Sequence, residues 1–242
     1  MKDPLRPATP DAAAGAEILA HDFNNLLAAI LGNADLALRE MPAAAPGRAA
    51  LENIRQASLR AAELTDQLLT YAGRRGVAMT RVAPRPLLDE LLRISAATMP
   101  ANVLVSAELG AELALRGDAS QVRQVLLNLI NNARDALGSR GGAIAITGRL
   151  CHHDGLAHAD DVVTAAAGTY VELVIADDGP CMTCDTRRRI FEPFFTTKPL
   201  GHGIGLAAVL GVIRAHSGGL RVESTPGDGA RFVVILPSTV TP

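Results

Sequence analysis

The chain has 242 residues, which is enough for one or two domains with apolar cores. Hydrophobic residues make up 48% of it, but aromatic residues only 3%, so Leu, Val, Ile and Ala must build the cores. The net charge of −2 gives nucleic-acid binding no electrostatic support. No apolar run approaches the ~20 residues of a membrane span, and the N-terminus lacks an apolar signal segment. We therefore expect a soluble, cytoplasmic chain without nucleic-acid or membrane contact.

The N-terminal part of the sequence has the period of two helices. Residues 1–15 are rich in Pro and Ala and read as a flexible tail. An apolar stripe then runs from residue 16 to about 41, and a second runs from 48 to 71, with two prolines and a glycine between them. Two long helices with a short loop predict an antiparallel hairpin. Because one hairpin leaves its apolar seam uncovered, we expect residues 16–75 to dimerise into an all-α four-helix bundle.

A second domain is predicted for residues 85–242, after a linker at 76–84. Helices are expected at 86–98, 118–137 and 204–215, and strands at 102–109, 143–150 and 170–177, with a strand hairpin closing the chain. Residues 151–168 read as a long loop within a hairpin. Helices mixed with antiparallel strands predict an α+β two-layer sandwich.

The stretch "HDFNN" brings candidate catalytic groups onto the first helix. His21 lies away from the apolar stripe, Asp22 is adjacent, and Asn25 follows one turn later. An imidazole nitrogen accepts a phosphoryl group well if the other ring nitrogen keeps its proton. Asp22 is suited to fix that tautomer, and Asn25 to position a water or a partner group on the same face. A solvated helix face is the alternative interpretation.

The helix predicted at 118–137 carries a polar stripe opposite its apolar face. Asn128, Asn132 and Asp135 follow one another at i, i+4 and i+7, so they share one side of the helix. Their oxygens are of the kind that Mg²⁺ prefers, directly or through water. By itself, such a stripe is equally typical of an outer helix face.

Three later motifs add to this stripe. "ADDGP" ends a strand with Asp177, Asp178 and Gly179, and a buried carboxylate there is able to accept a hydrogen bond from an amine. "FEPFFTTK" places Lys198 at the end of a segment expected to be loop. "GHGIGLA", residues 201–207, is a glycine loop that opens a helix, and its N–H groups suit phosphate.

In this order, the motifs resemble the core of a bacterial sensor histidine kinase. "AHDFNNLL" looks like the H box, "NLINNARDA" the N box, "DDGPCM" the G1 box, "FEPFFTTK" the F box and "GHGIGLA" the G2 box. "GDGARFVVILP" resembles the last glycine motif and closing strand. The resemblance covers about residues 16–237, and the "HDFNNLL" form is similar to kinases of the nitrogen-regulatory and hybrid type.

The resemblance implies a dimeric phosphoacceptor hairpin and an ATP-binding domain of the gyrase, chaperone and histidine-kinase superfamily. It implies that His21 takes the γ-phosphoryl group of ATP, that Asp22 assists, and that Asn25 serves in dephosphorylating a response regulator. Mg²⁺ would be held by Asn132 with help from Asn128. Residues 183–200 would form the ATP lid. The remaining nucleotide-binding residues would be Asp135, Asp177, Gly179, Lys198, Gly201, Gly203, Gly205 and Leu206.

The implied partners are a response-regulator receiver domain, a second copy of the chain, and a separate sensor domain or protein. The phosphoryl group would pass from His21 to an aspartate of the receiver domain. Two other functions stay open at this stage. One is a histidine phosphotransferase or pseudokinase with weakened use of ATP, and the other is an ATPase of the same superfamily.

One position departs from the family pattern. Cys181 stands where the G1 box has its second glycine, and a Cβ narrows both the backbone conformation and the approach of a ligand. We predict that ATP still binds. Cys181 and Cys184 form a C-x-x-C sequence, which we interpret as a zinc half-site, a redox pair or two unpaired thiols. "CHH" at 151–153 is expected about 20 Å away at the other end of a hairpin, which argues against zinc. In a reducing cytosol, unpaired thiols are favoured over a redox pair.

Overall fold

A computed structural model describes residues 26–42, 45–71, 78–96, 98–198 and 203–240. The chain divides into two compact units, Met1–Arg75 and Gly76–Pro242, each of which is described here by itself. Among the described residues, no helix is both long and apolar enough to cross a membrane.

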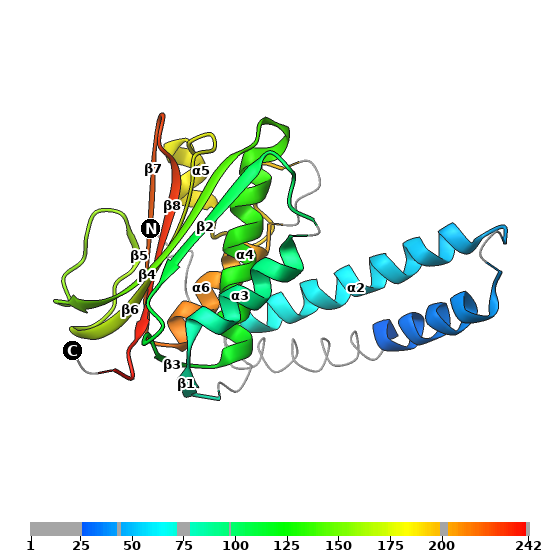
Figure 1. The fold of residues 1–242 in the computed structure, drawn as a ribbon, viewed down its shortest axis with the longest axis horizontal. Coiled ribbons are helices and arrows are strands. Elements are labelled where there is room, and N and C mark those ends of the chain that lie inside the picture. The colour runs from blue at the N-terminus through cyan, green and yellow to red at the C-terminus, as the bar shows by residue number, and fades with distance from the viewer. Residues whose placement is uncertain (1–25, 43–44, 72–77, 97, 199–202, 241–242) are drawn as a thin grey trace, which may run out of the picture. The chain divides into compact units, whose positions relative to one another are not determined.

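The N-terminal unit consists of two helical segments. Residues 26–40 are helical, and helix α2 spans Arg48–Tyr71 (Figure 1). Gly47 has a φ of +91°, and the Arg48 guanidinium donates to the carbonyl oxygens of Leu38 and Met41 at 2.7 and 2.9 Å. These bonds satisfy carbonyl groups that the end of the first helix leaves without partners. The helices predicted at 16–41 and 48–71 are confirmed over the residues of them that the structure describes.

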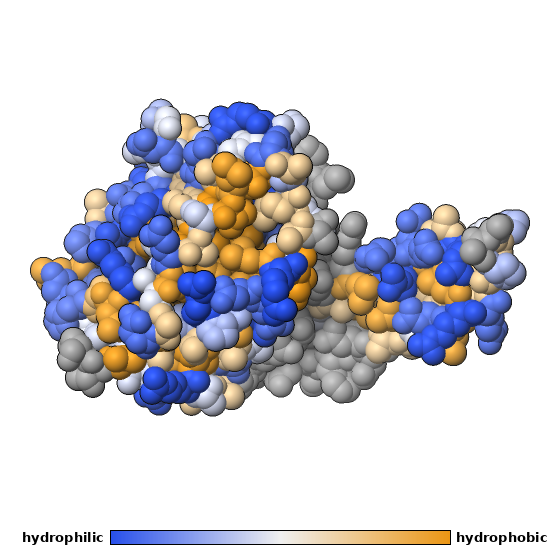
Figure 2. All heavy atoms as spheres, in the orientation of Figure 1, coloured by the Kyte–Doolittle hydropathy of each residue, from blue (hydrophilic) through white to orange (hydrophobic). Residues whose placement is uncertain are grey.

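The apolar stripe of the first helix is only partly covered within the single chain. Ala34 is buried, but the side chains of Leu26 and Ile30 are 63% and 46% exposed. Apolar and hydrophilic residues alternate over the visible face of this unit in Figure 2. The four-helix bundle stays a prediction, and the exposed stripe is the surface that it would cover.

The C-terminal unit is a six-stranded sheet with helices on one face (Figure 1). The strand order is β2-β4-β6-β8-β7-β5, and a separate two-stranded sheet pairs β1 with β3. The strands are β1 Thr80–Val82, β2 Val103–Leu109, β3 Leu115–Gly117, β4 Gly142–His153, β5 Asp161–Val163, β6 Gly168–Asp177, β7 Gly219–Thr225 and β8 Gly229–Pro237. The helices are α3 Pro84–Ser95, α4 Ala119–Leu137, the 3₁₀ turn η1 Gly138–Arg140, α5 Cys184–Arg189 and α6 Gly205–Ala215.

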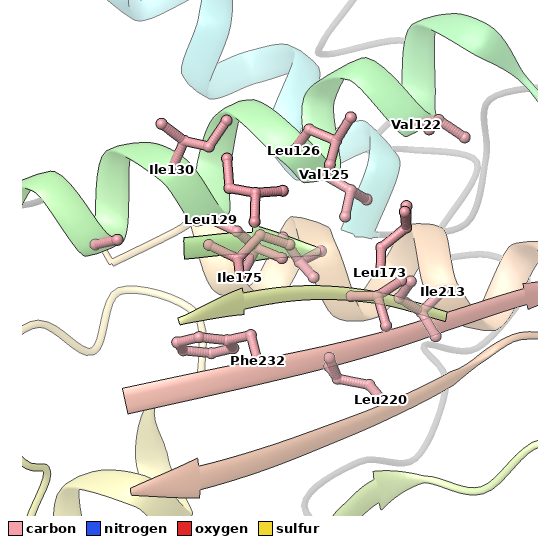
Figure 3. Packing of buried hydrophobic residues seen from close by; sticks show 14 of the residues in the cluster. Val122, Val125, Leu126, Leu129, Ile130, Leu173, Ile175, Ile213, Leu220 and Phe232 are labelled. Atoms are coloured by element: carbon pink, nitrogen blue, oxygen red, sulfur yellow. The ribbon is translucent and has the colours of Figure 1, made fainter. Parts of the chain in front are cut away.

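The core of this unit lies between α4 and the sheet. Figure 3 shows the apolar face of α4 packed over side chains of β6, β7, β8 and α6. Buried aliphatic side chains of this kind each contribute about 1.5–3 kcal/mol on leaving water. The largely aliphatic core expected from the composition is confirmed. It contains the buried rings of Phe191 and Phe232, and its aliphatic members include Val122, Leu126, Leu129, Ile130, Leu173 and Ile175.

Several predicted elements differ from the observed ones. β2 runs parallel to β4, so the sheet is not purely antiparallel. The predicted loop 151–168 instead extends β4 to His153 and contains β5, which pairs with β7. β5 thereby covers an edge whose backbone groups would otherwise lie unpaired. The predicted linker at 76–84 contains β1, which pairs with β3.

Candidate nucleotide site

Asp177 ends β6 with a buried carboxyl group. Its side chain is 4% exposed, and its Oδ1 accepts the N–H of Gly179 at 2.9 Å. Burial raises the pKa of this carboxyl, while N–H groups of Gly179 and Ala230 oppose the shift. A Cβ at position 179 would lie 2.5 Å from Asp177 Oδ1, so Gly179 allows the turn to close over the carboxylate. Such a carboxyl suits an exocyclic amine as ligand.

Asp178, the next residue, has a different role from Asp177. Asp178 is exposed, and its Oδ1 accepts the N–H of Ala143 at 2.8 Å, which ties the turn to the start of β4. Its carbonyl oxygen also accepts from the Arg140 guanidinium at 2.5 Å. The paired acids therefore separate into Asp177, whose carboxyl is buried, and Asp178, whose carboxyl anchors the turn.

The strand hairpin β7–β8 supports the same turn. Gly229 has a φ of +75°, and a Cβ there would overlap the carbonyl oxygen of Asp177. The Ser224 hydroxyl donates to the carbonyl oxygen of Gly229 at 3.0 Å and accepts the N–H of Met182 at 2.8 Å. Sequence analysis missed Ser224, since a single Ser in a strand carries no recognisable signal.

Asn128 joins the N box to the G2 box. Its side-chain Nδ2 donates to the carbonyl oxygen of Gly205 at 3.1 Å, which links the middle of α4 to the first residue of α6. Asn128 is thus engaged with the backbone, whereas Asn132 lies one turn further along the same stripe.

Lys198 brings the rest of the polar stripe together. Its Nζ donates to Asn132 Oδ1 at 3.0 Å and lies 3.2 Å from Asp135 Oδ2. Asp135 also pairs with Arg134 at 2.9 Å. An ammonium group held by an amide oxygen and a carboxylate shows that these side chains converge on a cation. This donor set also fits Mg²⁺, which prefers the same oxygen ligands.

The glycine loop leads directly into α6. Gly203 has a φ of +66°, and a Cβ there would overlap the backbone of Phe194 and Phe195. The N–H of Phe194 donates to the carbonyl oxygen of Gly203 at 2.9 Å. The N-cap residue Ile204 makes no side-chain hydrogen bond to the N-terminus of α6, where Gly205 and Leu206 begin the first turn. Their N–H groups suit an anionic ligand.

Part of the predicted site lies outside the described residues. His21, Asp22, Asn25 and Gly201 belong to this group. The described residues Asn128, Asn132, Asp135, Asp177, Gly179, Lys198, Gly203, Gly205 and Leu206 belong to the C-terminal unit.

The segment predicted to form the ATP lid contains a short helix that was not predicted. α5 begins after Thr183, whose hydroxyl accepts the N–H of Thr186 at 3.1 Å. Arg187 of α5 pairs with Asp160, in the segment before β5, at 2.5 Å. The Arg189 guanidinium lies 4.2 Å from the ring centroid of Phe195. The described part of the lid is therefore tied at its start to the far edge of the sheet.

His216 has a structural role that the sequence did not reveal. It is 1% exposed, its Nε2 accepts the N–H of Asp118 at 3.0 Å, and its Nδ1 lies 2.9 Å from the carbonyl oxygen of Val212. Because Nε2 accepts an N–H, it carries no proton, and Nδ1 donates to Val212. Burial lowers the pKa of this ring. The ring at the C-cap of α6 thereby joins this helix to Asp118, the N-cap of α4.

Cys181 does not need the conformational freedom of glycine. Among described non-glycine residues, only Phe194 and Ser217 have positive φ. Both Cys181 and Cys184 are free and exposed. β4 and β6 pair from Ile144 opposite Asp177 to His153 opposite Gly168. Residues 151–153 therefore lie at the end of this strand pair away from Asp177, which agrees with the expectation that they are too far from Cys181 to share a zinc ion. Among described residues, no three His, Cys, Asp or Glu side chains form a metal-binding group. The redox interpretation stays untested.

Two family models match this arrangement. Residues 117–240, just over half of the chain, match the Histidine kinase-, DNA gyrase B-, and HSP90-like ATPase family, and residues 16–75 match the His Kinase A phospho-acceptor domain. The chain belongs to the histidine kinase family. The expected ATP-binding sandwich following a phosphoacceptor helical segment is thereby confirmed.

Relatives of this chain include the sensor kinase CckA of Brucella abortus, 33% identical over 92% of this chain and 24% of that protein. The sensory histidine kinase/phosphatase NtrB of Rhodobacter capsulatus is 30% identical over 96% of this chain and 64% of that protein. A crystal structure of full-length ShkA in complex with AMPPNP matches with a TM-score of 0.72 and 25% identity, over 97% of this chain and 47% of that one. The chain thus spans only part of the length of these relatives.

Proposed function

We propose that this chain is the core of an ATP-dependent kinase that phosphorylates its own His21 and passes the phosphoryl group to an aspartate of a response regulator. The observation that carries the proposal is the buried carboxyl of Asp177 beside Gly179, in the same domain as the Asn132 stripe and the glycine loop. The match of residues 16–75 to a phosphoacceptor domain supplies the substrate histidine.

In this proposal, the C-terminal unit binds and orients ATP. Asp177 accepts the N–H of the adenine amine, and the N–H groups at the start of α6 face the phosphates, with Gly203 and Gly205 allowing close approach. Asn132 and Asn128 would hold Mg²⁺, which would neutralise phosphate charge. Lys198, next to Asn132, is positioned to contact the same phosphates.

The chemical step is a phosphoryl transfer within the protein. A nitrogen of His21 forms a bond to the γ-phosphorus, the bond to the β–γ bridging oxygen breaks, and ADP leaves with the electron pair. Asp22 accepts the N–H of the other ring nitrogen and so keeps the attacking nitrogen basic. The phosphoryl group then moves from nitrogen to a carboxylate oxygen of the receiver domain.

Several further features belong to the same proposal. Asn25 positions a water that removes the phosphoryl group from the regulator, and the relative NtrB is likewise a kinase/phosphatase. The exposed Leu26 and Ile30 support a homodimer, because a second copy would cover them. The signal would reach this core from a separate sensor domain or protein, and the location would be cytoplasmic, where ATP is available.

A pseudokinase or phosphotransferase is the second candidate, favoured by Cys181 in the G1 box. Incubation of the chain with γ-labelled ATP and Mg²⁺ separates the candidates, with His21→Gln as the control. We expect acid-labile, base-stable label on the wild type and none on the control. No label and no free phosphate would favour the second candidate, and free phosphate without protein-bound label would indicate an ATPase.

A further inference from the structure

The cation that lies in the predicted magnesium position is a lysine, and lysine is rare in this chain. Of 23 basic residues, 21 are Arg, leaving only Lys2 and Lys198. An ammonium is a compact point charge with three donors, whereas a guanidinium is a planar fork that matches carboxylates and phosphates. The residue in contact with Asn132 and Asp135 is thus the basic side chain that most closely mimics a small metal cation.

The contacts of Lys198 include an oxygen atom that the metal would need. Its Nζ uses Asn132 Oδ1 at 3.0 Å and Asp135 Oδ2 at 3.2 Å. Asn132 is the residue that the proposed function assigns to Mg²⁺. Two cations cannot occupy the same position, since like charges that close repel strongly.

The backbone around Lys198 belongs to the ATP lid. The N–H of Lys198 donates to the Thr196 hydroxyl oxygen at 3.0 Å. The N–H of Phe194 donates to the carbonyl oxygen of Gly203, in the glycine loop. A displacement of Lys198 therefore also displaces the end of the lid that is next to the glycine loop.

We propose that Lys198 competes with Mg²⁺ for Asn132 and Asp135, so that metal binding with a nucleotide releases the end of the lid from α4. The inference rests on the proposed function, because it uses the same nucleotide site. Released from α4, the ammonium is free to contact the terminal phosphate of ATP. Lys198 therefore binds α4 when nucleotide and Mg²⁺ are absent, and binds the nucleotide when they are present.

The replacement of Lys198 by Mg²⁺ costs little electrostatic free energy. Lys198 is 35% and Asp135 40% exposed, and pairs with this exposure contribute little to stability. Asp135 keeps the Arg134 guanidinium at 2.9 Å after Lys198 leaves. The carboxylate is therefore never left without a cation, whichever partner Asn132 has.

The test is a titration of ADP into the full chain at a series of free Mg²⁺ concentrations. ADP lacks the γ-phosphate, so it removes any contact of Lys198 with that group. For Lys198→Met we expect the half-saturating Mg²⁺ concentration to fall about two- to fivefold, the scale of a part-exposed ion pair. Arg188→Met is the matched control, since it removes the same charge from an exposed site of the lid, and it should behave like the wild type.

An unchanged or higher Mg²⁺ requirement in Lys198→Met would overturn the competition while leaving the kinase assignment intact. Wild type that binds no ADP at any Mg²⁺ concentration would overturn both. A second measurement follows the amine itself, using an acylating ester and peptide mass spectrometry. Acylation of Lys198 should rise when Mg²⁺ and ADP are added, with Lys2 as the internal reference, and an equal or lower yield would contradict release.

Discussion

The side-chain amide of Asn128 donates to the carbonyl oxygen of Gly205 at 3.1 Å and so joins the polar stripe of α4 to the first residue of α6. Both helices contribute to the proposed phosphate end of the site. This bond fixes their separation there, much as His216 does near the N-terminus of α4. Positions that hold phosphates and metal together depend on such contacts as much as on the ligands themselves.

Asn128→Ala should weaken both the fold and the site. Loss of one part-buried hydrogen bond costs about 1 kcal/mol of unfolding free energy. We expect a corresponding fall in the urea midpoint and weaker ADP binding, measured on the same preparation. Asn132→Ala serves as the comparison, since it should reduce Mg²⁺-dependent ADP binding with less effect on the midpoint. Equal stability of Asn128→Ala and wild type would contradict the role assigned to this bond.

Asp177→Asn should separate nucleotide binding from folding. The amide keeps the shape of the carboxyl and accepts the N–H of Gly179, but it no longer provides the charged acceptor for an adenine amine. We expect adenine-nucleotide affinity to fall at least about tenfold, as for a hydrogen bond to a charged group. Burial raises the pKa of this carboxyl, so its neutral replacement should leave the unfolding midpoint unchanged or raise it. Retained affinity would remove Asp177 from the site.

His216 predicts a pH dependence of stability. Its pKa in the folded chain is lowered by burial, whereas the unfolded value is about 6.5. Between these two values the unfolded chain binds a proton that the folded chain excludes. The contribution of His216 is therefore complete above pH about 6.5 and is lost as the pH falls towards the folded pKa.

The measurement is urea unfolding at pH values from about 7.5 down to about 5. His216→Gln should be less stable at neutral pH and should lose part of the slope. Asp118 needs separate consideration: burial alone would raise its pKa, but bonds from the Ser120 hydroxyl and from N–H groups including that of Gln121 lower it. Its contribution is thus lost only at a lower pH than that of His216. Identical slopes in wild type and His216→Gln would contradict the assignment.

Cys181→Gly tests the departure from the G1 pattern. Because Cys181 has no positive φ and its side chain is exposed, restoring glycine should change ADP affinity less than about threefold, the scale of surface substitutions. Titrations under reducing and oxidising conditions should also agree if the two thiols are unpaired. A tenfold gain on Cys181→Gly would show that the Cβ obstructs the ligand.

The sequence was most informative where the signal is local. The period of α4 and the order of the boxes predicted which residues of that helix face the core and which form the polar stripe. β5 was missed, and so was the parallel pairing of the predicted strand β2 with β4, since both depend on residues far away in the chain. The roles of Ser224 and His216 were also missed, because each depends on a backbone group that only folding brings near.

The account depends most on the delivery of the γ-phosphoryl group from the Asp177 site to His21. Peptide mapping of the full chain by mass spectrometry at neutral pH, after incubation with ATP and Mg²⁺, tests it most directly. We predict one phosphorylated peptide, containing His21, in the wild type and none in His21→Gln or Asp177→Asn. A phosphoryl group on another residue, or one that persists on the His21→Gln protein, would contradict the account.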